Sequence, residues 1–224
     1  MKKRILCACM AVLVMLAVFS GCNKNPQTDE TTTLAGEGGS DIVEENLTTT
    51  KKPVSSEKLI ALTFDDGPHK THTNEILDIL EKNGATATFF LVGYNIEKNV
   101  ETIKRAANMG CEIANHSLSH KNLMKITSEE ISEQVKGPNE LIKSLAGVDI
   151  KLFRAPGGNF DGVTDKIGMP LIQWSIDTED WKYKDAAHKD RSEEQRNADL
   201  NKIANRVIEK ADKGDIVLMH DIYG

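Results

Sequence analysis

The sequence predicts an α/β domain built on a parallel sheet, either a distorted (β/α) barrel or an open doubly wound sheet. From residue 58 onward, strand-prone apolar runs alternate with helix-prone runs. Most of the strand-prone runs are continuously apolar, which is typical of parallel strands covered on both faces. Polar clusters follow five of the six runs. Active sites of α/β barrels form at the C-terminal ends of the strands, so these clusters are the candidate site.

The first 22 residues have the composition of an export signal. A basic start, Lys2-Lys3-Arg4, precedes an apolar run over 5–19 that is short for a membrane span. Small residues then lead directly into Cys22, an arrangement that resembles the lipobox of bacterial lipoproteins. We therefore expect lipidation of Cys22 and a place on the extracellular face of a bacterial cell membrane. The alternative is an ordinary secretory signal that releases the protein to the cell wall.

Residues 23–57 are predicted to be a disordered linker, and 58–224 to be the folded domain. The linker is rich in Thr, Glu, Gly, Ser and Asn, and it has too few bulky apolar residues to offset chain entropy on folding. The formal net charge of the 224-residue chain is −6 and its basic residues are dispersed, which argues against nucleic acid as a partner. Cys111 is the one cysteine beyond the N-terminal segment, so the domain contains no internal disulfide.

Six strands are predicted from runs of apolar and β-prone residues. A Gly-Pro pair breaks the chain soon after the first of them, and polar residues end most of the others. In chain order the candidates are 59–64, 87–92, 111–114, 151–153, 171–176 and 216–219.

Helices are predicted between these strands. Residues 74–82 and 97–109 carry apolar side chains at helical spacing, and each range ends at a turn that contains glycine. A longer third helix is capped by Thr127 or Ser128, with Glu130 placed to complete a capping box.

Two stretches depart from this regular pattern. Pro138 lies inside the third helix and is expected to kink or split it, because proline lacks a donor and clashes with the preceding turn. Residues 182–196 are polar and highly charged, and we expect a loop or an exposed helix there, beside the candidate site.

Two carboxylates and two imidazoles dominate the polar clusters. Asp65 and Asp66 follow the first strand, and one interpretation is that they form a solvated turn. The other is that both carboxylates face one cleft, where their repulsion would require a bound cation or a shared proton. His116 and His120 are four residues apart and can face one side of a helical turn. Such a pair is often a surface feature. With one carboxylate added, however, it becomes a set that suits Zn2+ or a similar divalent ion. The second carboxylate would remain free to accept a proton.

Five motifs in order resemble the polysaccharide deacetylases of carbohydrate esterase family 4. They cover 59–220 and read Thr-Phe-Asp-Asp-Gly-Pro, His-Ser-x-x-His, Arg-x-Pro-x-Gly, Asp-x-x-Asp-Trp and Leu-x-His. The resemblance implies a distorted (β/α) barrel of about seven strands. It also implies a metal-dependent hydrolase that removes N-acetyl groups from glycans. Members of the family usually continue with another helix and strand, so we expect this barrel to be incomplete at the C-terminus.

The resemblance also implies roles for individual residues. Asp65 is the general base, oriented and charge-paired by Arg154. His220 is the general acid that protonates the leaving amine, and Asp180 is the carboxylate that steadies it. The implied metal ligands are Asp66, His116 and His120. The implied ion is a divalent metal, with Zn2+ favoured over Co2+, Mn2+ or Ni2+.

Three further residues are implied to contact the substrate. Leu218 lines the pocket for the acetyl methyl, and the backbone N–H of Gly157 supports the oxyanion. Trp181 forms the aromatic wall of the sugar groove, with partly buried packing as an equally weighted alternative. Gly157 stands where the family often has a bulkier residue, commonly Tyr, so we expect that side of the groove to be more open.

The expected activity is N-deacetylation of N-acetylhexosamine polymers, with cell-wall peptidoglycan favoured by the anchor. Chitin oligosaccharides and acetylxylan are the alternative substrates. A different class of function is a glycan-binding protein that keeps the fold but has little catalytic power. The expected partners are a glycan polymer and, through Cys22, a membrane, and the protein is expected to be a monomer.

Overall fold

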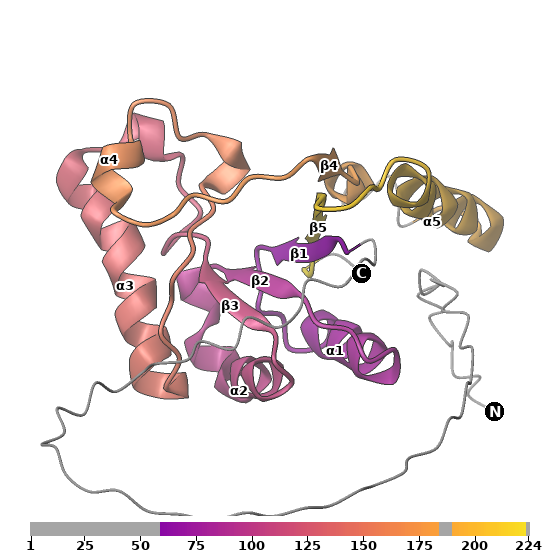
Figure 1. Ribbon diagram of the computed structural model, residues 1–224, viewed down its shortest axis with the longest axis horizontal. Helices are drawn as coiled ribbons and strands as arrows, with labels where there is room; N and C mark the ends of the chain where they lie inside the picture. The colour runs from indigo at the N-terminus through magenta and orange to yellow at the C-terminus, as the bar shows by residue number, and fades with distance from the viewer. Residues whose placement is uncertain (1–58, 184–189, 223–224) are drawn as a thin grey trace, which may run out of the picture. The chain divides into compact units, whose positions relative to one another are not determined.

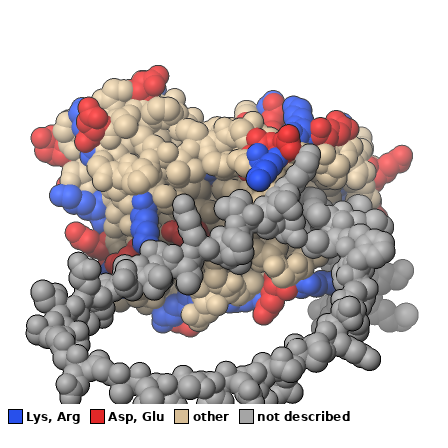
Figure 2. Space-filling view, viewed as in Figure 1, with Lys and Arg blue, Asp and Glu red and all other residues tan. Residues whose placement is uncertain are grey.

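The computed structural model describes residues 59–183 and 190–222. The predicted signal segment 1–22 with Cys22, the whole of the predicted linker 23–57 and the domain boundary at 57–58 lie outside the described residues. Within the described ranges, every helix is too short or too polar to cross a membrane. On the face drawn in Figure 2, acidic and basic side chains are interspersed, and uncharged residues cover most of the described surface.

The centre of the domain is a five-stranded sheet in the order β3-β2-β1-β5-β4, in which every pairing is parallel (Figure 1). This confirms the predicted α/β class. Each predicted strand lies within two residues of an observed strand or bridge, because buried apolar runs favour the pleated conformation. The strands are β1 Ala61–Asp65, β2 Thr88–Leu91, β3 Glu112–Asn115, β4 Ile176–Asp177 and β5 Ile216–His220.

Two single-residue bridges extend the sheet toward a barrel. Phe153 is bridged on one side to Asn115 of β3 and on the other to Leu171, both in parallel. The chain runs from Leu171 directly into β4, which pairs with β5. The bridges thus carry the pairing from β3 as far as Leu171, and the covalent chain makes the remaining link to β4. Of the two architectures that the sequence left open, the bridges fit the distorted barrel.

The barrel is irregular beside Phe153, where the side chain of Arg154 takes the place of part of the pairing between backbone strands. The strand predicted over 151–153 is reduced to the bridge at Phe153, so the described residues contain fewer regular strands than the seven or so expected. Beside it, Arg154 Nε donates to the carbonyl of Ile172 at 3.2 Å, and an Arg154 Nη donates to the carbonyl of Gln173 at 3.4 Å. The guanidinium thus satisfies carbonyls that a neighbouring strand would otherwise pair.

Helices surround this sheet. In Figure 1, α3 and α4 lie together beyond β3, whereas α5 lies beyond β4 at the opposite edge. Thr127 caps α3 with the predicted capping box, in which Thr127 Oγ1 accepts from the N–H of Glu130 at 3.2 Å. Pro138 does not split α3, which is continuous through it. The helices are α1 His72–Lys82, α2 Val100–Asn108, α3 Ser128–Ala146, α4 Thr164–Ile167 and α5 Glu193–Ile208.

The charged stretch predicted over 182–196 is only partly described. A short 3-10 helix, η5 Asp180–Tyr183, occupies its start, and 184–189 lie outside the described residues. Ser192 caps α5 with a second capping box, completed by Gln195. An exposed helix is therefore present, but it begins near the end of the predicted stretch and extends twelve residues beyond it, to Ile208.

A single apolar core fixes β1, β2 and β3 against α1 and α2. Phe89 of β2 stacks on Phe64 of β1 with ring centroids 5.3 Å apart, and Leu77 of α1 is fully buried beside them. Truncating a buried phenylalanine costs about 3–5 kcal/mol, so the register of these strands is strongly determined. The strand ends that carry the polar clusters are held in place by this core.

Candidate active site

The predicted site residues come together because their strands are parallel neighbours. β1 ends at Asp65, β3 ends just before His116, and β5 ends at His220. Parallel neighbours place their C-terminal ends at one edge of the sheet. Asp66 and His120 follow in the connecting loops. Residues that are far apart in the sequence therefore meet at this edge.

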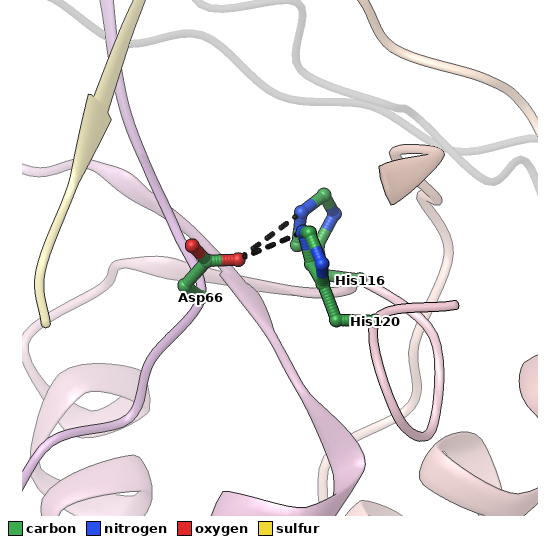
Figure 3. A group of neighbouring side chains, drawn as sticks. All are labelled: Asp66, His116 and His120. Atoms are coloured by element: carbon green, nitrogen blue, oxygen red, sulfur yellow. Dashed lines mark ion pairs between the residues drawn. The ribbon is translucent and has the colours of Figure 1, made fainter. Parts of the chain in front are cut away.

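Asp66, His116 and His120 form a group that could hold a metal ion (Figure 3). Oδ1 of Asp66 lies 3.2 Å from Nε2 of His120 and 3.5 Å from Nε2 of His116. The three ligand atoms lie within 4.8 Å of one another. Two imidazole nitrogens and one carboxylate oxygen are a donor set that divalent transition metals and zinc accept. The residues present therefore fit such an ion.

The protonation of His116 suits a metal ligand. Its Nδ1 lies 2.8 Å from the carbonyl oxygen of Arg154, which fixes Nδ1 as the donor and turns the lone pair of Nε2 toward Asp66. Burial lowers the pKa of His116 to about 3, against the opposing effect of Asp66. The imidazole is therefore neutral at physiological pH, which is the form that binds metals.

The two histidines do not lie on a helical turn as the i, i+4 spacing suggested. They lie in a loop, and Ser117 and His120 both have left-handed backbone (φ 70° and 54°). The loop is held by Asn115 Oδ1, which accepts from the N–H of Ser117 at 2.7 Å, and by Ser117 Oγ, which accepts from the N–H of His120 at 2.9 Å. Side-chain acceptors thus stabilise a conformation that non-glycine residues rarely adopt.

Asp65 and Arg154 form a buried ion pair beside the histidines. An Arg154 Nη donates to Oδ1 of Asp65 at 2.7 Å and to Oγ1 of Thr63 at 2.8 Å. The other Asp65 oxygen lies 3.6 Å from Nε2 of His116. Burial raises the pKa of Asp65 to about 6, although the pairing with Arg154 lowers it. A carboxylate with a pKa near the working pH is suited to accept and release a proton.

His220 and Asp180 form the second charged pair. Oδ1 of Asp180 lies 2.8 Å from Nδ1 of His220, and Oδ2 accepts from the backbone N–H of the same histidine at 2.7 Å. Burial lowers the pKa of His220, but the hydrogen bond and the charge of Asp180, together with the charges of Asp66 and Asp65, outweigh it, so the pKa is raised above its usual value. The imidazolium form of His220 therefore persists to a higher pH than that of an unperturbed histidine.

The residues predicted to contact substrate occupy different environments. Gly157 has left-handed backbone (φ 62°), where a larger residue would be strained, so the glycine is suited to the conformation of this loop. Trp181 is 39% exposed, and its indole N–H points to Asp177 at 3.5 Å, so the ring is not packed in the core. Leu218 is buried in β5.

Asp221 is a buried carboxylate beside the site, and the sequence analysis assigned it no role. Its Oδ2 accepts from Oγ1 of Thr73 at 2.5 Å, and its backbone N–H donates to the carbonyl of Asp65 at 3.3 Å. A side chain at Gly67 would collide with this carboxylate. Burial raises the pKa of Asp221 to about 7. The only signal in the sequence was its place directly after His220.

A comparison with known families identifies the group to which this protein is related. The profile of the polysaccharide deacetylase family matches residues 52–169, more than half of the chain. The chain belongs to the polysaccharide deacetylase family. The match covers the loops that carry Asp66, His116 and His120, and this family membership confirms the resemblance seen in the motifs.

Two curated relatives and one solved structure illustrate the family. A bifunctional xylanase/deacetylase of Pseudobutyrivibrio xylanivorans is 39% identical over 171 residues, which cover 75% of this chain and 26% of the relative. The peptidoglycan-N-acetylglucosamine deacetylase PgdA of Listeria monocytogenes is 37% identical over 167 residues, with 74% and 33% covered. The chain thus spans about a quarter to a third of these curated relatives.

The structure of the peptidoglycan deacetylase PdaC from Bacillus subtilis has the same fold. It aligns with a TM-score of 0.66 at 35% identity, and the alignment covers 75% of this chain and 77% of that one. The described strands and helices therefore follow the architecture of a family member whose structure is solved.

Proposed function

We propose that this polysaccharide deacetylase removes N-acetyl groups from an N-acetylhexosamine polymer, with cell-wall peptidoglycan as its substrate. One observation carries the proposal. The buried Asp65–Arg154 pair lies beside His116 of the Asp66–His116–His120 group, and His220, paired with Asp180, ends the neighbouring strand β5. Hydrolysis of an amide requires a base for water and an acid for the amine.

The first half of the reaction needs a base at the water and support for the oxyanion. A divalent ion held by the three ligands would supply a Lewis acid that activates water and polarises the amide oxygen. Asp65 would accept the proton of the attacking water, and Arg154 keeps its carboxylate oriented. The backbone N–H of Gly157 would donate to the developing oxyanion. Asp65 suits this role because it is buried and held in one orientation.

The second half needs a proton at the leaving nitrogen. His220, charged through its bond with Asp180, would donate the proton from Nε2 as the C–N bond breaks. The products are acetate and a free amine on the sugar. Trp181 and Leu218 would position the sugar and the acetyl methyl, respectively.

The choice of peptidoglycan rests on the relatives and on the N-terminal segment. PgdA is named for peptidoglycan N-acetylglucosamine, and the PdaC structure is also that of a peptidoglycan deacetylase. A lipid anchor at Cys22 would hold the domain on the outer face of the membrane, within reach of the wall. We propose Zn2+ as the ion and a monomeric enzyme.

Acetate release from three substrates tests this function. The purified chain, reconstituted with Zn2+, would be incubated with peptidoglycan, chitin oligosaccharides and acetylated xylan. We expect release from peptidoglycan and a free amine on the sugar detected by mass spectrometry. Faster release from chitin oligosaccharides or from acetylxylan would reassign the substrate. No release from any of the three would contradict the proposed activity.

Replacing Asp180 by Asn is expected to shift the pH profile of acetate release. The raised pKa of His220 keeps its acid form populated as pH rises, and activity falls once pH passes that pKa. The substitution removes the charge that raises it, so the alkaline limb should move to lower pH and activity at neutral pH should fall. Rate measurements from pH 5 to 10 would show this. An alkaline limb at the same pH in both proteins would contradict the role of the pair.

A further inference from the structure

The most exposed large apolar side chain among the described residues is Tyr94, at 68% exposure. It lies in the 3-10 helix η1 Gly93–Asn95, which follows the C-terminal end of β2. Single exposed apolar residues are common and need no explanation. Tyr94 differs from a scattered surface residue in its position at the C-terminal edge of the sheet and in the hydrogen bonds that its backbone makes. The other exposed large apolar residues are Leu59, Met124, Leu145, Trp181, Leu200 and Ile208.

The backbone around Tyr94 is bonded directly to the loops that carry the proposed metal ligands. The N–H of Tyr94 donates to the carbonyl of Leu118 at 3.0 Å, and the N–H of Gly93 donates to that of Ser117 at 3.0 Å. Asn95 Nδ2 donates to the carbonyl of Asp66 at 2.9 Å. A Cβ at Gly93 would collide with the backbone of Leu118, so the two loops are in close contact. Tyr94 is thus fixed relative to the site.

The strand order places Tyr94 and Trp181 on opposite sides of Asp66. β2 lies between β3, which leads to the histidines, and β1, which leads to Asp66. Trp181 follows β4, which lies beyond β5. From β2 to β4 is three strand spacings, or about 14 Å along the sheet. Two exposed aromatic residues therefore lie on opposite sides of Asp66 along this edge, Tyr94 next to the loops that carry the ligands and Trp181 after β4, two strands away from β1.

We propose that Tyr94 is a binding platform for a sugar unit of the glycan that neighbours the unit being deacetylated. This inference rests on the proposed function. The C–H face of a pyranose ring is apolar and packs on an aromatic ring, while the phenol hydroxyl can bond a sugar hydroxyl. Tyrosine provides this contact at a low cost in side-chain entropy, and the bonded backbone lowers that cost further.

Replacing Tyr94 by Ala tests the platform with N-acetylglucosamine oligomers of two to six units. In the unaltered chain, KM should fall as the oligomer lengthens. In Tyr94→Ala we expect KM for the longer oligomers to rise about tenfold, as for aromatic side chains that become covered by a ligand, with kcat and the KM of the dimer unchanged. Tyr94→Phe should keep most of the length dependence. Ile208→Ala, a comparably exposed residue at the end of α5, is the matched control and should change nothing.

Two results would overturn the platform. One is a KM series in Tyr94→Ala that matches the unaltered chain at every length. The other is an equal rise for the dimer and the hexamer, which would indicate a general disturbance of the site. Calorimetric binding of the hexamer to Asp65→Asn, with and without Tyr94→Ala, separates this question from catalysis. Weaker binding with the second substitution supports the platform even if no acetate is released. Equal binding, or no binding by either protein, contradicts it.

Discussion

Asp65→Asn is expected to lower the rate of acetate release by about 10²–10⁴-fold, the usual contribution of a general base. The amide has nearly the shape of the carboxylate and can still accept from Arg154, so residue 65 loses its negative charge but keeps its contact with the guanidinium. It cannot accept a proton from water at any pH near neutrality. The measurement is the initial rate of acetate release from peptidoglycan, with binding of a soluble glycan fragment determined in parallel.

Two controls make the Asp65 result specific. Binding of the fragment should be nearly unchanged, because the substitution affects proton transfer and leaves the groove intact. Asp78→Asn, at an exposed carboxylate of α1 that pairs with Arg105, should leave both rate and binding as they were. Acetate release by Asp65→Asn at the rate of the unaltered chain would show that Asp65 is not the base.

The sheet was predictable from the sequence because burial on both faces leaves a local signature. β1, β2, β3 and β5 each contain buried apolar residues in a strand-prone run, and their expected positions differ from the observed ones by at most two residues. The run at 151–153 failed to form a regular strand for a non-local reason. Arg154, next in the chain, turns inward to Asp65 and bonds the carbonyls of the adjacent segment. No local pattern contains that contact.

The residues that carry the chemistry of the site could also be predicted from the sequence, whereas the residues that hold its loops in place could not. Asp66, His116 and His120 are the residue types that bind divalent ions, and parallel strands bring them to one edge. The loops are held by asparagine and serine side chains, and no sequence pattern distinguishes these residues from the other asparagines and serines of the chain. Asn115 and Ser117 act through hydrogen bonds to left-handed backbone, and the i, i+4 spacing of the histidines wrongly indicated a helical turn.

His120→Ala is expected to remove divalent metal from the protein and, with it, more than about 100-fold of the activity, since loss of an outer partner alone costs 10–100-fold. The His120 side chain is 45% exposed, so its loss should not unfold the domain. Asp66→Asn should act in the same direction because it replaces the carboxylate that lies near both imidazoles. Metal content by mass spectrometry and Zn2+ affinity by calorimetry are the measurements.

His72→Ala provides the matched control for the metal prediction. His72 stacks on His69 and pairs with Glu75 at the start of α1, and it is not one of the three proposed ligands, so its loss should leave metal content and activity unchanged. A strong chelator should abolish acetate release by the unaltered chain, and Zn2+ should restore it. In His120→Ala, restoration should require a much higher Zn2+ concentration because one of three ligands is missing. Full activity of a chelated, metal-free protein would contradict the metal site, whatever the sequence motifs suggest.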